Sequence, residues 1–109
     1  MPLRVVLMIG IFCLTWLSGC SLHDENLRDG IRSFQVQNYR QAFVRLMPEA
    51  EKGQPDAQYA VGYMYYYGQG VVEDRSKAWH WISCAAKAGQ ADAISAVRIL
   101  KRVHSKNTQ

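Results

Sequence analysis

Apolar residues in the middle of the chain recur at intervals of three and four, which is the period of a helix with one buried face. The clearest case is the range 75–88, which lies between Asp74 as a candidate N-cap and Gly89 as a stop. Its apolar stripe consists of Ala78, Trp81, Ile82, Ala85 and Ala86. The pattern predicts a helix over 75–88, and its small alanines predict close approach by a neighbouring helix.

The same period predicts a helix over 39–52, with Asn38 as its cap and Gly53 as its stop. Pro48 lies inside this range. A proline removes one backbone hydrogen bond and clashes with the carbonyl four residues earlier, so we expect a kink or a broken turn there. A further short helix before Asn38 is predicted from Leu27, Ile31 and Phe34.

Two more helices follow from the positions of proline and glycine. Pro55 suits the first turn of a helix over 55–67, and the glycines of 68–70 end it because they can adopt a left-handed backbone. Gly70 is expected to need that conformation, whereas Gly62 lies inside the helix, where alanine is favoured. A last helix is predicted over 91–103, which gives five helices and no sheet.

The chain also contains an internal repeat. A shift of 36 positions brings the predicted pair 39–67 onto 75–103, a period typical of helical-hairpin repeats. Eight identities result: Ala42 with Ala78, Ala50 with Ala86, Gly53 with Gly89, Gln54 with Gln90, Asp56 with Asp92, Ala57 with Ala93, Ala60 with Ala96, and Val61 with Val97.

The segment AQYAVGYMYYYGQGV, residues 57–71, is followed by Asp74, Lys77-Ala78, Trp81, Ala85-Ala86 and Gly89. This pattern resembles the Sel1-like repeat family, which is related to tetratricopeptide repeats, and the resemblance extends over about 38–100. It implies an all-α fold, a short right-handed solenoid of antiparallel, tetratricopeptide-like helix pairs with about five helices. Ile82, Cys84 and Pro48 depart from the family pattern.

The amino terminus reads as a secretion signal. A basic start over 1–4 precedes the uncharged apolar run 5–16, which is shorter than the roughly 20 residues that span a bilayer. Leu17-Ser18-Gly19-Cys20 resembles the lipobox of bacterial lipoproteins. The resemblance implies diacylglycerol on Cys20, cleavage before it and a further acyl chain, such as palmitate, on the new amino terminus. Ser21 implies sorting to the outer membrane, facing the periplasm.

These signals predict the domain organisation. Residues 1–19 form a lipoprotein signal peptide, 20–25 a lipidated tether, 26–104 the helical repeat domain and 105–109 a tail.

Candidate chemistry is sparse. Cys13 falls in the signal and Cys20 would carry lipid, so Cys84 has no partner for a disulfide within the chain. His80 and Cys84 share a helix face, but two ligands do not complete a tetrahedral zinc site. Ser83 also lies near His80, with no third group in sight to orient the histidine. We therefore expect no catalysis, metal or cofactor.

Charge adds little to this picture. The net charge of +4 is mild, and the basic residues near the end are expected to be a solvated helix terminus. Nucleic acid is not an expected partner. The leading hypothesis is a lipid-anchored envelope protein that binds or scaffolds a protein or peptide partner through stacked repeats. The alternative, implied by the family resemblance, is a peptidoglycan-related enzyme or accessory factor of cell-wall remodelling.

The predicted partner surface lies on the first helix of each pair, outside the packing stripe, because such helices line the concave side of tetratricopeptide-like stacks. It comprises Arg40, Val44, Lys77, His80, Ser83, Cys84 and Lys87. This polar, mildly basic surface favours an acidic or extended peptide. An ordinary solvated helix face is the competing interpretation.

The aromatic residues between 63 and 81 provide a second candidate surface. Tyr65 and Trp81 match core positions of the family pattern and are assigned to packing. Tyr63, Tyr66 and Trp79 lie off the main stripes and are predicted to form an aromatic binding patch.

Overall fold

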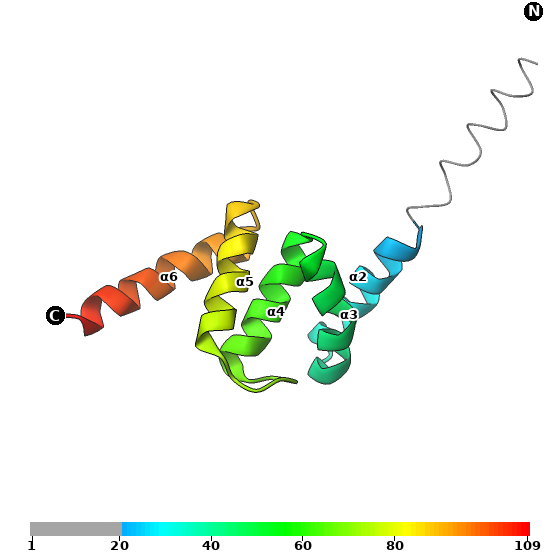
Figure 1. Ribbon diagram of the computed structural model, residues 1–109, viewed down its shortest axis with the longest axis horizontal. Coiled ribbons are helices and arrows are strands. Elements are labelled where there is room, and N and C mark those ends of the chain that lie inside the picture. The colour runs from blue at the N-terminus through cyan, green and yellow to red at the C-terminus, as the bar shows by residue number, and fades with distance from the viewer. Residues whose placement is uncertain (1–20) are drawn as a thin grey trace, which may run out of the picture.

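The computed structural model describes residues 21–109. This part of the chain contains five helices and no strand (Figure 1). Consecutive helices pack side by side, and α2 also contacts α4. The predicted all-α fold of paired helices is confirmed. The helices are α2 (Ser21–Gln35), α3 (Tyr39–Glu51), α4 (Pro55–Tyr67), α5 (Arg75–Lys87) and α6 (Ala91–Asn107).

The predicted helix boundaries agree with the structure where a proline, a capping side chain or a glycine marks the end of a helix. Helix α4 begins at Pro55, and the Asp74 carboxylate caps α5 by accepting a hydrogen bond from the Lys77 backbone N–H at 3.0 Å. The residues after α3, α4 and α5 include glycines with positive φ angles, as expected for helix stops. Local sequence therefore determines most of the ends.

Two features of α3 differ from the prediction. Asn38 occupies the N-cap position of α3, but its side chain makes no capping bond and donates to the Gln41 side-chain oxygen at 3.2 Å instead. Helix α3 continues through Pro48, so the broken turn expected there is wrong. Pro48 is exposed, and the Val44 carbonyl that loses its partner lies on an exposed residue, where water can bond it.

The two ends of the described chain are more helical than predicted. Helix α2 begins at Ser21, so residues 21–25 of the predicted tether are helical. Helix α6 continues to Asn107 and includes part of the predicted tail. Cys20 and the signal peptide lie outside the described residues.

Two buried clusters hold the helices together. The larger one joins α3 and α4 through Leu46, Val61 and Met64 with several alanines, and Ile31 and Phe34 of α2 pack against it. The smaller one joins α5 and α6 through Ile82, Ala85 and Ala93. Short alanine side chains at these contacts allow the helix axes to approach closely.

The tight contact between α4 and α5 explains why Gly62 is glycine. A Cβ atom at position 62 would lie 2.6 Å from Cγ1 of Ile82, 3.1 Å from its backbone nitrogen and 3.2 Å from the Ala78 carbonyl oxygen. Packing against α5 therefore opposes the helix propensity that favours alanine at this position, and the structure predicts a net loss of stability for Gly62→Ala.

The turn between α4 and α5 needs glycine for two reasons. Gly70 has a φ angle of +72°, and a Cβ there would lie 2.6–2.8 Å from backbone atoms of Tyr39 and Arg40. The turn thus packs against the start of α3. The prediction of a left-handed backbone at Gly70 is confirmed.

Candidate partner-binding site

The face formed by the first helices is polar and exposed. Arg40 and Val44 of α3 are exposed, as are Lys77, His80 and Lys87 of α5. All five side chains are therefore accessible, as a binding surface requires.

Tyr65 of α4 connects the two helices beneath this surface. Its ring meets Phe43 of α3 edge-on, with centroids 5.5 Å apart, and the Lys77 ammonium of α5 lies 5.4 Å from its centre. Tyr65 packs against the larger core cluster and Trp81 is half-buried against the same cluster, which agrees with their predicted packing role.

Of His80, Ser83 and Cys84 on α5, His80 and Cys84 lie in contact with each other. His80 Nε2 lies 4.0 Å from Cys84 Sγ, and the imidazole also meets the Trp81 ring edge-on. The Ser83 hydroxyl is buried and has no hydrogen-bond partner. Among the residues that the structure describes, no group of three or more metal-ligand side chains occurs.

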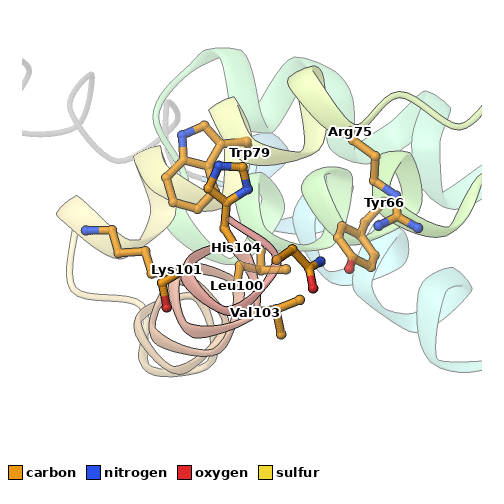
Figure 2. Close-up of a pocket in the computed structure, with 9 residues that line it drawn as sticks. Tyr66, Arg75, Trp79, Leu100, Lys101, Val103 and His104 are labelled. Atoms are coloured by element: carbon orange, nitrogen blue, oxygen red, sulfur yellow. The ribbon is translucent and has the colours of Figure 1, made fainter. Parts of the chain in front are cut away.

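Of the three residues of the predicted aromatic patch, Tyr66 and Trp79 line one pocket, and Tyr63 joins Tyr66 at a second, smaller one. Tyr63 packs between Phe34 of α2, at a centroid distance of 5.3 Å, and Tyr67, at 4.7 Å. Tyr66 and Trp79 instead face a pocket of about 620 Å³ between the end of α4, the start of α5 and the second half of α6 (Figure 2). The pocket is lined by Tyr66, Arg75, Trp79, Leu100, Lys101, Val103, His104, Ser105 and Asn107.

Apolar groups form the walls of this pocket, and cationic groups lie at both ends. In Figure 2, Arg75 and Tyr66 lie at one end, and Trp79 and Lys101 at the other. The Arg75 guanidinium carbon lies 3.7 Å from the centre of the Tyr66 ring, and its Nε donates to Glu73 Oε1 at 2.9 Å. Arg75 thus contacts both Tyr66 and Glu73 while its side chain stays 57% exposed, and Trp79 is 42% exposed.

Two of the helices that line this pocket, α4 and α5, also carry a recognisable repeat. Residues 55–90, which include α4, the glycine turn and α5, match the family model of the Sel1 repeat. These residues form a Sel1 repeat. No curated protein and no solved structure matches the chain. Sel1 repeats generally mediate protein–protein interaction and act as scaffolds, not as catalysts.

The Sel1 repeat supplies three of the pocket residues, Tyr66, Arg75 and Trp79, and α6 supplies the rest. The sequence pattern predicted Tyr66 and Trp79 as binding residues. It did not predict the residues of α6 that line the pocket, because the basic residues of this helix were interpreted as a solvated helix end. No sequence signal marks this half of α6, and the structure alone shows that it is less buried than its equivalent in the preceding pair. A shift of 36 positions places Leu100 on Met64, which is 0% exposed, whereas Leu100 is only half-buried.

A smaller pocket of about 190 Å³ lies between α4, which belongs to the Sel1 repeat, and α6. Tyr59, Tyr63 and Tyr67 line its α4 side, and Ile99 of α6 faces them. Burial raises the pKa of the Tyr59 hydroxyl above its ordinary value, and the nearby Asp92 carboxylate, Tyr63 and Tyr67 raise it further. Tyr59 packs against the cluster of Ile82, Ala85 and Ala93.

No helix within residues 21–109 combines the length and the apolar character needed to cross a membrane.

Proposed function

We propose that the mature protein is a lipid-anchored envelope protein, held at the outer membrane and facing the periplasm, which binds or scaffolds a protein or peptide partner. The binding part of this proposal rests on one observation, the open pocket beside Tyr66 and Trp79 that lies between the Sel1 repeat and α6. Tyrosine and tryptophan are enriched where proteins bind one another, because they supply rigid apolar area with a polar tip.

The first-helix face supports the same function. Exposed cations at Arg40, Lys77 and Lys87 lie on α3 and α5, and the exposed Val44 adds apolar area. A surface of this kind favours an acidic or extended peptide. Together with the pocket, it gives the protein two candidate contact areas for one partner.

The anchoring part rests on Leu17-Ser18-Gly19-Cys20 and on the preceding apolar run. Each buried CH₂ of an acyl chain contributes about 0.8 kcal/mol, so more than one chain on Cys20 would hold the protein stably on a membrane. We expect mass spectrometry of the mature protein to show a lipidated Cys20 at its amino terminus. An unmodified Cys20, or a product that retains Met1, would contradict the anchoring proposal.

Capture of the partner tests the binding proposal. Full-length protein is retrieved from membranes after chemical crosslinking, and the polypeptides retained by the wild type are compared with those retained by two double variants. Lys77→Glu/Lys87→Glu changes the first-helix face, and Tyr66→Ala/Trp79→Ala changes the pocket. All four side chains are at least partly exposed, so a folded double variant is attainable; circular dichroism checks this.

We expect at least one double variant to lose a polypeptide that the wild type retains, with its helical signal and melting preserved. Retention of the same polypeptides by both folded variants, or of none by the wild type, would contradict partner binding through this repeat.

A further inference from the structure

We infer that the pocket between α5 and α6 is the docking site for an acidic amphipathic segment of the partner, which inserts a bulky apolar side chain between Trp79 and Leu100. This inference rests on the proposed function and deepens it, because it assigns one contact area and the chemistry of its occupant.

Helix α6 is less well covered than its equivalent in the preceding pair. Met64 of α4 is fully buried, whereas the equivalent Leu100 of α6 is half-buried and lines the pocket. Val103 and Ile99 in the same half of α6 are 52% and 59% exposed. The described chain covers this apolar face only in part, because Leu100 packs against the cluster of Ile82, Ala85 and Ala93 while Ile99 lines the smaller pocket. Burial of the remaining exposed area by a partner would be favourable.

The positive charge of α6 favours an acidic partner. After Asp92 the chain contains no further acidic residue, while four lysines and arginines follow between positions 98 and 106. No salt bridge within residues 25–109 involves these four cations. A cationic helix repels another copy of itself and attracts an acidic segment.

The pocket provides the corresponding geometry. Lys101 of α6 lies at its edge, and His104 lies beside Trp79 in the view of Figure 2. Tyr66, Trp79, Leu100 and Val103 form its apolar surface. One apolar anchor can enter the pocket while acidic residues one helical turn away meet Lys101. This is the helix-in-groove arrangement, in which apolar anchors at helical spacing set affinity and the flanking charges set specificity.

A membrane surface fits the site less well than a peptide. The start of α2, which follows Cys20 directly in sequence, and the end of α6 lie at opposite sides of the molecule (Figure 1). A protein anchored at Cys20 therefore presents the pocket away from its anchor. An acidic protein segment can reach the pocket in this orientation.

The test uses the full lipidated chain in phosphatidylcholine nanodiscs and a synthetic peptide probe of about four helical turns. The probe carries leucines on one face, glutamates beside them and no tryptophan, and a matched peptide carries lysines in place of glutamates. Binding is measured from the tryptophan emission, because covering the exposed Trp79 shifts it to shorter wavelength while Trp81 is already half-buried.

Two variants separate the pocket from the general charge of α6. Lys101→Glu changes a pocket residue, and Lys106→Glu makes the same change on the same helix at a position that does not line the pocket. Both side chains are exposed, so neither change should disturb folding. We expect binding of the glutamate peptide to weaken about tenfold or more in Lys101→Glu and clearly less in Lys106→Glu.

Equal binding of the two peptides, or equal loss in the two variants, would overturn the inference. So would Lys101-dependent binding to phosphatidylglycerol vesicles without peptide binding, which would assign the site to lipid headgroups. A dimer seen by sedimentation in wild type but not in Lys101→Glu would assign it to a second copy. If the peptide does not bind but capture depends on Lys77 and Lys87, the inference fails and the proposed function stands.

Discussion

The replacement Gly62→Ala tests the packing of the Sel1 repeat most sharply, because helix propensity and tertiary packing predict opposite results. The added Cβ would lie 2.6 Å from Ile82 Cγ1 and 3.1–3.2 Å from two backbone atoms of α5. A side chain can rotate away from such a contact. The two backbone contacts are relieved only if α5 itself moves.

The size of the effect follows from two opposing terms. Alanine in place of glycine in a helix interior stabilises by about 1 kcal/mol. Overpacking a close contact costs roughly 1–3 kcal/mol, and the backbone contacts place Gly62→Ala near the upper end. The net loss is about 2 kcal/mol, which lowers the melting temperature of a domain of this size by about 10 °C.

Thermal unfolding followed by circular dichroism at 222 nm measures this effect. Ser95→Ala is the control, since Ser95 is exposed inside α6 and alanine there should change stability by no more than about 0.5 kcal/mol, toward greater stability. A melting temperature for Gly62→Ala equal to or above that of the wild type would refute the close approach of α4 and α5.

Three further changes test other parts of the fold. Gly70→Val should destabilise more than Gly62→Ala, because its Cβ would meet only backbone atoms of α3 and its φ angle is +72°; an equal or higher melting temperature would contradict this. Asp74→Ala should cost about 1 kcal/mol in urea unfolding through loss of the cap to Lys77, while Asp74→Asn should cost much less; equal losses would exclude capping. The raised pKa of Tyr59 means that folding favours its neutral form. The contribution of Tyr59 to the free energy of unfolding is therefore fully present below about pH 10, the ordinary pKa of tyrosine, and is lost as the pH rises through the pKa of the folded state. Tyr59→Phe should flatten this alkaline decline in melting temperature, and an unchanged profile would contradict the assignment.

Sequence could predict the helices because their ends depend on neighbouring residues. Pro55 begins α4, Asp74 caps α5, and glycines with positive φ follow α3, α4 and α5. The 36-residue repeat then placed the helices in pairs. Each of these signals depends on residues only a few positions apart, so it can be recognised in the sequence alone.

What sequence could not predict depends on contacts between distant residues. Gly62 is required by Ala78 and Ile82 on the next helix, and Pro48 is tolerated because its surroundings are open to water. The pocket exists because α6 leaves space beside Tyr66 and Trp79. Helical periodicity in the sequence does not show how closely two helices pack.

The most direct test of the account is to place a photoreactive phenylalanine derivative at position 79 of the full-length protein in living cells. The control position is Val36, which is 68% exposed, lies in the turn after α2 and belongs to neither proposed surface. The account predicts an adduct from position 79 with an acidic segment of another envelope protein, absent from position 36 and weakened by Lys101→Glu. Absence of any polypeptide adduct from position 79, and likewise from positions 77 and 87, would contradict the claim that this protein holds a partner.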